Sequence, residues 1–154
     1  MAAAPAGSSG AHVRVAIVGL GAIGREVLKA VKARPGLALT AVADAAPALV
    51  GKDAGKLSGI GPCGVKVVAS ADEAFAAGDV DVAIVLTASG VADVVPIVEA
   101  AAARGVDVVS TCEDLAYADL SAPELARKID ARARAAGITV LGTGVNPGFV
   151  MDRL

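Results

Sequence analysis

The chain is poor in the residues that build nucleic-acid interfaces, metal centres and disulfide frameworks. Its 154 residues include no tryptophan, one tyrosine, two phenylalanines, one histidine and two cysteines. Two cysteines make neither a disulfide framework nor a zinc site, and no basic cluster is interleaved with aromatic residues. These absences argue against a metal centre and a nucleic-acid partner, and the low cysteine content favours the cytoplasm.

A long hydrophobic run is also absent. Hydrophobic residues make up 55% of the chain and its mean hydropathy is +0.66. However, no uninterrupted apolar run reaches the roughly 20 residues that span a bilayer. The excess is mostly alanine, and the formal net charge is −2. The composition therefore favours one soluble, tightly packed α/β domain with no membrane partner.

The first twelve residues show no pattern typical of a folded element. They lack the basic start and the long apolar core of a signal peptide, so we expect a disordered tail over 1–12. His12, the only histidine, lies at the edge of this tail. We interpret it as an incidental surface residue and not as a catalyst.

The sequence does contain a strand, a glycine turn and a helix in succession. The apolar run over 13–18 is rich in β-branched residues and predicts a buried strand. A G-x-G-x-x-G turn follows, in which successive glycines allow a tight turn, leave room for a pyrophosphate and let helix and strand pack closely. The helix N-terminus then offers N–H groups to the phosphates. The candidate contact residues of this turn are Gly19, Gly21, Ala22, Ile23 and Gly24.

The helix after the turn is predicted from an apolar stripe. Ile23, Val27, Ala30 and Val31 recur at i, i+4, i+7 and i+8. We expect this stripe to face the core.

An acidic residue follows the second predicted strand. That strand covers 37–43 and ends in Asp44, which lies 20 residues after Gly24. This spacing is the one expected for the carboxylate that binds an adenine ribose. Without the spacing, Asp44 would be read as an aspartate that caps its own backbone at the start of a loop. The charge of Asp44 repels a 2′-phosphate, and the residues that follow it are Ala45 and Ala46 and not an arginine that could bind one. The sequence therefore favours NAD over NADP, and Lys52 is the residue that could reverse this preference.

Further strands alternate with helices along the chain. Strands are predicted over 65–69, 81–86, 106–109 and 138–141. One helix is predicted to follow Ser70 or Asp72, a second to end at Arg104, and a third to cover 123–136. Pro96 suits a first helical turn better than an interior, so the start of the helix that ends at Arg104 stays open. Six alternating strands predict an α/β fold with a doubly wound parallel sheet, a Rossmann-type dinucleotide-binding domain over 13–148.

Two hydroxyls follow the fourth predicted strand. Thr87 and Ser89 would point into the ligand crevice at the carboxyl end of the sheet, or would cap the next helix. Lys52 and Lys56 belong to a long connection over 45–64, where they lie over the adenosine end of a cofactor or are solvated.

Four stretches resemble a known family. VGLGAIGREV, the 44–53 stretch with LVGKD, Ser110-Thr111-Cys112-Glu113 and GTGVNPGFVMD are similar to the N-terminal half of 2,4-diaminopentanoate dehydrogenases, within the dihydrodipicolinate-reductase-like group. The first stretch is widely shared among nucleotide-binding proteins. LVGKD and NPGFVMD are narrower and carry the resemblance.

The resemblance implies an NAD(P)-dependent oxidoreductase. In that family the C4 amine of a diamino acid is oxidised to a ketone, with hydride passing to the nicotinamide and ammonia released. By this resemblance the three glycines hold the pyrophosphate and Asp44 holds the adenine ribose. Thr87 and Cys112 would line the nicotinamide side of the crevice, and Asn146 would lie near the nicotinamide amide.

The family continues into a second domain that binds the amino-acid substrate and supplies acid/base groups. We interpret 149–154 as the start of a connection to such a domain, so we expect no turnover by this chain alone. The uncovered apolar surface predicts a homo-oligomer. Two alternatives stay open: a stand-alone dinucleotide-binding redox sensor or regulatory module, and a Rossmann domain that binds S-adenosylmethionine.

Overall fold

The computed structural model describes residues 12–87 and 90–144 and contains one six-stranded sheet. The strands lie in the order β3-β2-β1-β4-β5-β6, and all five pairings between them are parallel. This confirms the predicted doubly wound sheet. The strands are β1 (Val13–Val18), β2 (Leu37–Ala43), β3 (Val67–Val68), β4 (Val82–Val85), β5 (Asp107–Ser110) and β6 (Val140–Gly142).

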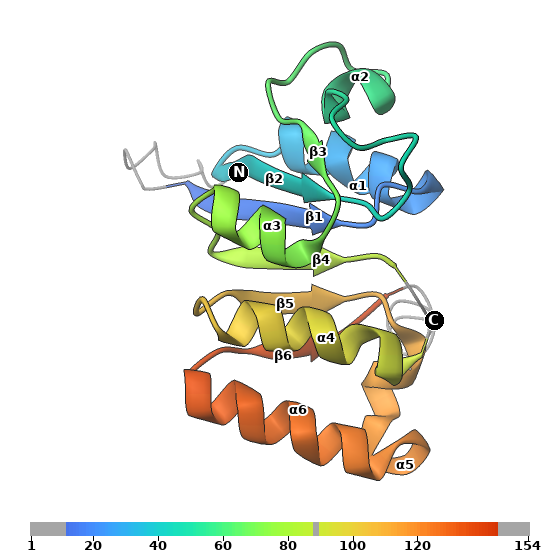
Figure 1. Cartoon of the computed structure of the whole chain (residues 1–154), viewed down its shortest axis with the longest axis vertical. Helices are drawn as coiled ribbons and strands as arrows, with labels where there is room; N and C mark the ends of the chain where they lie inside the picture. The colour runs from blue at the N-terminus through green and yellow to red at the C-terminus, as the bar shows by residue number, and fades with distance from the viewer. Residues whose placement is uncertain (1–11, 88–89, 145–154) are drawn as a thin grey trace, which may run out of the picture.

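Helices cover the sheet on both faces. Figure 1 shows α3 and α4 on one face and α1 on the other, with α6 beside α4. The chain leaves β1 toward β2 and β3, and then returns to place β4 on the other side of β1. Ligands of such sheets bind where the strand order reverses. The helices are α1 (Ala22–Ala33), α2 (Ala54–Leu57), α3 (Ala71–Ala77), α4 (Val91–Ala102), the 3₁₀ helix η1 (Glu113–Tyr117), α5 (Ala118–Ser121) and α6 (Pro123–Ala136).

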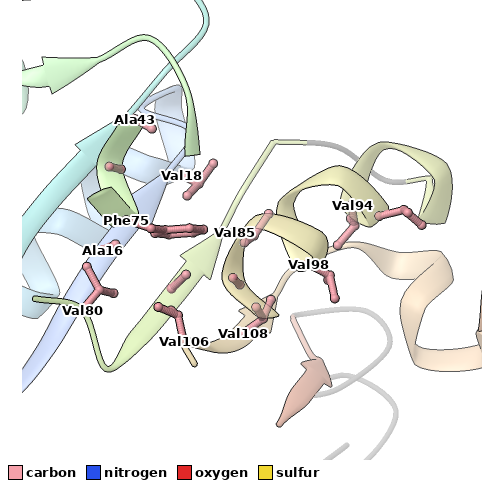
Figure 2. Packing of buried hydrophobic residues seen from close by; sticks show 14 of the residues in the cluster. Ala16, Val18, Ala43, Phe75, Val80, Val85, Val94, Val98, Val106 and Val108 are labelled. Carbon is pink, nitrogen blue, oxygen red and sulfur yellow. The ribbon is translucent and has the colours of Figure 1, made fainter. Parts of the chain in front are cut away.

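The core has two layers that share the sheet. Because side chains alternate along β1, Val15 and Ile17 face α1, whereas Ala16 and Val18 face α3. Figure 2 shows Phe75 of α3 packed against this second face. Burial on both faces explains why residues 15–18 of β1 form a continuous apolar run.

The apolar stripe predicted for α1 faces the core only in part, because Val27 and Val31 pack against the core and Ile23 does not. Ile23 is 65% exposed, and the buried residues of the helix are Gly24, Leu28 and Val31. The reason lies at the turn, because a Cβ on Gly24 would collide with the carbonyl oxygen of Gly19. This close approach fixes the rotation of α1 and turns Ile23 outward.

Pro96 lies inside α4, which begins at Val91, although proline suits a first helical turn better. Proline removes the donor for the carbonyl oxygen of Ala92, four residues earlier. Both residues are exposed, so water can satisfy that oxygen.

The other element boundaries follow the sequence closely. The helix over 123–136 has the predicted bounds, and it ends at Gly137, whose φ of 68° is left-handed. Ser70 caps α3 by accepting a hydrogen bond from the Glu73 N–H, and Glu73 reaches back to the N–H of Ala69. β3 is shorter than the predicted 65–69, and the last two strands each begin later than predicted.

Some predictions lie outside the described residues. These are the tail over 1–11, Ser89, Asn146 and the connection over 149–154. His12 is exposed. Within the described part of the chain, no helix is both long and apolar enough to cross a membrane.

Candidate functional site

A groove of about 670 Å³ opens at the carboxyl ends of β1, β2 and β4. It lies where the strand order reverses, with β1 between β2 and β4. Parallel α/β sheets bind their ligands at this position. The lining residues are Val18, Gly19, Gly21, Ala43, Asp44, Ala45, Ala69, Ser70, Ala71, Leu86, Thr87, Asp93 and Ile97.

The glycine turn forms one end of this groove. Gly19 has a φ of 99°, and a Cβ there would lie 2.9 Å from the carbonyl oxygen of Leu86. Only glycine suits both the dihedral angle and this approach to the end of β4. Gly21 is exposed, and a Cβ on it would meet nothing within 4 Å, so the space in front of it is open.

The N-terminus of α1 faces this open space. Gly21 is its N-cap, and no side chain of the described residues caps it. The first turn also contains no acidic residue. Its N–H groups are therefore available to an anion, which the helix dipole favours.

Asp44 connects the end of β2 to the glycine turn. One carboxylate oxygen accepts a 2.6 Å hydrogen bond from the Leu20 N–H, and the other accepts a 2.8 Å bond from the Ala46 N–H. The second bond is the backbone cap considered from the sequence. Asp44 is half-buried and still lines the groove, so its proposed contact with a ribose stays a prediction.

Arg25 is a candidate that the sequence analysis missed. Its Nε lies 3.3 Å from the carbonyl oxygen of Leu20, which places a cation beside the glycine turn. A cation in the first turn of a helix is opposed by the helix dipole, unless an anion binds there. An arginine directly after Gly24, in the first turn of a helix, was the sequence feature that could have indicated an anion-binding residue.

Thr87 lies where the sequence places it, at the carboxyl end of β4 and in the groove. Its Cγ2 would be 3.1 Å from a Cβ on Gly19. Thr87 does not cap α4, because the N-cap of that helix is Gly90. Thr87 therefore lines the groove, and its contact with a cofactor stays a prediction.

The Cys112 side chain does not reach the groove. It is 1% exposed and belongs to the core between the sheet and α4. Burial raises the pKa of its thiol, and its backbone N–H donates to Ser110 Oγ at 3.1 Å. A contact between Cys112 and a cofactor would thus have to use the backbone.

The side chains of Ala22 and Ile23 also lie outside the groove. They border a separate apolar surface on the exposed side of α1, with Glu26, Val27 and Ala30. Their backbone N–H groups remain at the N-terminus of the helix. A role for these two residues in cofactor binding would rest on the backbone alone.

The connection over 45–64 is organised around Asp53. Its carboxylate accepts hydrogen bonds from the N–H groups of Lys56, Cys63 and Gly64, which lower its pKa to about 2. Lys52 and Lys56 are exposed and do not line the groove. Across 12–87 and 90–144, no group of three or more His, Cys, Asp or Glu residues could hold a metal.

The wall opposite the glycine turn was not predicted. It comes from the N-terminus of α3, with Ser70, and from α4, with Asp93 and Ile97. These contacts depend on how α3 and α4 pack against each other and on the sheet, which residue spacing does not encode.

Known proteins are similar to this chain in sequence and in architecture. Residues 13–122 match the family described as dihydrodipicolinate reductase, N-terminus. Over 51 residues the chain is 47% identical to 2,4-diaminopentanoate dehydrogenase from Acetoanaerobium sticklandii, a match that covers 33% of this chain and 14% of that protein.

Two solved structures are similar over most of the chain. Amine dehydrogenase from Mycobacterium smegmatis matches with a TM-score of 0.81 and 31% identity, over 86% of this chain and 39% of its own. GenD2 from gentamicin A biosynthesis, solved in complex with NAD, matches with a TM-score of 0.66 and 26% identity, over 97% of this chain and 40% of its own.

The chain spans less than half the length of each of these relatives. The family match nevertheless covers most of the described sheet, from β1 to the start of α6. It includes the glycine turn, Asp44 and Thr87, which meet in the groove. The chain therefore belongs to the family of the dihydrodipicolinate reductase N-terminal domain.

Proposed function

We propose that this chain is the dinucleotide-binding part of an oxidoreductase and that the groove binds the adenosine and pyrophosphate of NAD. The observation that carries the proposal is the meeting of the glycine turn and Asp44 at the point where the strand order reverses. The groove volume of about 670 Å³ lies in the range of small-molecule sites.

Each residue has a distinct proposed role. The pyrophosphate lies in front of Gly21, where no Cβ blocks it, and accepts hydrogen bonds from the first N–H groups of α1. Arg25 balances its charge from beside the turn. Asp44 accepts hydrogen bonds from the ribose hydroxyls with the lone pairs that Leu20 and Ala46 leave.

The charge of the groove supports NAD over NADP. Its described lining contains two carboxylates, Asp44 and Asp93, and no lysine, arginine or histidine. A 2′-phosphate would add negative charge beside Asp44 without a cation in the lining to balance it. The similarity to GenD2, solved with NAD, supports the same choice.

The proposed reaction is the oxidative deamination of an amino acid that carries a second amine. It rests on the similarity to 2,4-diaminopentanoate dehydrogenase and amine dehydrogenase. When bound, the cofactor accepts the hydride, and this chain's residues hold and orient it. Substrate-binding and proton-transfer groups are proposed to lie in the regions of these relatives that this chain does not match, so this chain alone does not turn over.

Fluorescence titration with NADH and, separately, NADPH tests the cofactor assignment. The chain contains no tryptophan and one tyrosine, so its own emission interferes little. We expect saturable enhancement with NADH and weaker binding of NADPH. Binding of neither nucleotide would refute the proposal, and amine-dependent formation of NADH by the purified chain would refute the claim that it does not turn over alone.

A further inference from the structure

The groove continues past Asp44 into a slot between α3 and α4. One side is formed by small residues at the start of α3, Ala69, Ser70 and Ala71. The other side is formed by Asp93 and Ile97, which share one face of α4 because they are four residues apart. Figure 1 shows α3 and α4 on the same face of the sheet. Most of these side chains are small or apolar, which suits a flat aromatic ring.

Asp93 is the only charged residue of this slot among the described lining residues. It is exposed, and its Oδ2 would lie 3.4 Å from a Cβ on Gly90, so the carboxylate is turned toward the start of α4. No described residue donates a hydrogen bond to this carboxylate or forms an ion pair with it. It is therefore an acceptor whose described surroundings leave it available to a ligand.

A carboxylate at the edge of such a slot distinguishes between purines. An ionised aspartate only accepts hydrogen bonds. The 6-amino group of adenine donates hydrogen bonds, whereas a 6-oxo purine presents an acceptor at the same position. An adenine amine would thus be attracted to Asp93, and a 6-oxo group would be repelled.

We propose that Asp93 is a specificity-determining residue that accepts a hydrogen bond from the 6-amino group of the adenine base. This inference rests on the proposed function, because it assumes that the adenosine half of NAD occupies the groove. It adds a base-recognition contact on α4 to the phosphate and ribose contacts of the glycine turn and Asp44. Asp93 also lies in the first turn of α4, where the helix dipole favours an acid, so a purely structural role must be separated by experiment.

The test compares NADH with its hypoxanthine analogue, deamino-NADH, by fluorescence titration. We expect the unaltered chain to bind NADH about tenfold more tightly, as for the loss of a hydrogen bond to a charged group. In Asp93→Asn the two affinities should become nearly equal, because an amide can accept from the amine or donate to the oxo group. Asp93→Ala should also lose the preference.

A matched control is Asp72→Asn, which changes an acid in the first turn of α3 that does not line the groove. It should retain the tenfold preference, and circular dichroism should show that all variants are folded. Equal binding of the two nucleotides by the unaltered chain, or an unchanged preference in folded Asp93→Asn, would overturn the inference while leaving the proposed function intact. Binding of neither nucleotide would overturn the proposed function and this inference with it.

Discussion

The carboxylate of Asp44 accepts a 2.6 Å hydrogen bond from the backbone N–H of Leu20, and thereby joins the end of β2 to the glycine turn after β1. The parallel register places Val18 opposite Ala43, so the two strands leave the sheet side by side. The N–H of Gly19 donates to the carbonyl oxygen of Ala43 at 2.8 Å and reinforces this arrangement. Asp44 can therefore shape the turn while it faces the groove.

Asp44→Ala should weaken both folding and binding. Leu20 is 0% exposed, and removing the carboxylate would leave its N–H without this acceptor. The expected loss in the free energy of unfolding is roughly 1–3 kcal/mol, measured by urea denaturation. NADH affinity should fall in parallel. Asp119→Ala, an exposed position on α5, is the control and should change neither quantity.

Asp44→Asn separates the two roles. The amide keeps one acceptor for the Leu20 N–H but removes the charge that repels a 2′-phosphate. We expect stability closer to that of the unaltered chain and a higher ratio of NADPH affinity to NADH affinity. A ratio that does not change would argue that Asp44 does not set the cofactor preference.

The strands and the glycine turn could be predicted from the sequence because their signals are local. A strand segment buried on both faces needs a continuous apolar run, which residues 15–18 of β1 and 41–43 of β2 have. Asp44 follows from its offset to Gly24, since the β2–β1 pairing brings the two ends together. These predictions depend on chain geometry that all such folds share.

The features that the sequence did not reveal depend on packing between elements. The rotation of α1 is set by the approach of Gly24 to Gly19, and its hydrophobic residues alone suggested another face. Cys112 lies two residues after β5, and its position in the sequence does not show that its side chain is buried in the core. Asp93 was overlooked because its place in the groove requires α4 to lie beside α3.

Gly21 and Gly24 form a matched pair with opposite expected effects. Gly24→Ala should lower the free energy of unfolding by roughly 1–3 kcal/mol, because the new methyl would meet the backbone of Gly19. Gly21→Ala should change stability little, since its φ of −69° suits alanine and its surroundings are open. It should instead weaken NADH binding, because the methyl occupies the proposed pyrophosphate position.

Urea denaturation and NADH titration on both glycine variants check this contrast. Tight NADH binding by Gly21→Ala would place the pyrophosphate elsewhere. A Gly24→Ala variant as stable as the unaltered chain would contradict the packing described for α1.

Arg25→Gln should weaken NADH binding about tenfold, as for the loss of one charge-assisted contact to a phosphate. Stability should change little, because the side chain is only half-buried and its observed bond to Leu20 is long at 3.3 Å. The salt dependence of NADH binding should also decrease, since fewer charges take part. Lys32→Gln, in the last turn of α1, is the control and should leave affinity unchanged.

Acid should destabilise the fold through Asp53 and Asp81. Backbone N–H groups, Lys56 first, lower the pKa of Asp53 to about 2, and Arg14 lowers that of Asp81 to about 2. Because the pKa is lower in the folded state, each carboxylate stabilises the fold above its ordinary pKa near 4. That contribution should be lost as the pH falls from about 4 to about 2.

Urea midpoints measured across this pH range test the effect. Asp53→Asn and Asp81→Asn should each start less stable at neutral pH and lose less stability on acidification. The exposed Asp119→Asn should follow the unaltered chain. A variant of Asp53 or Asp81 with an unaltered pH profile would show that its carboxylate is not linked to folding.

Leu141 is expected to promote self-association, because it is an apolar side chain left uncovered on the edge strand β6. It is 51% exposed, whereas its neighbour Val140 packs against the core on the opposite face. Leu141 pairs with Val109, which pairs with Ile84, so an apolar row crosses three strands. Leu141→Lys should shift the chain toward the monomer in sedimentation velocity, since a charge on this row opposes its burial between two copies. Lys128→Leu, with its charge removed from α6, is a control that should not produce this shift. A clean monomer of the unaltered chain at high concentration would contradict the expectation.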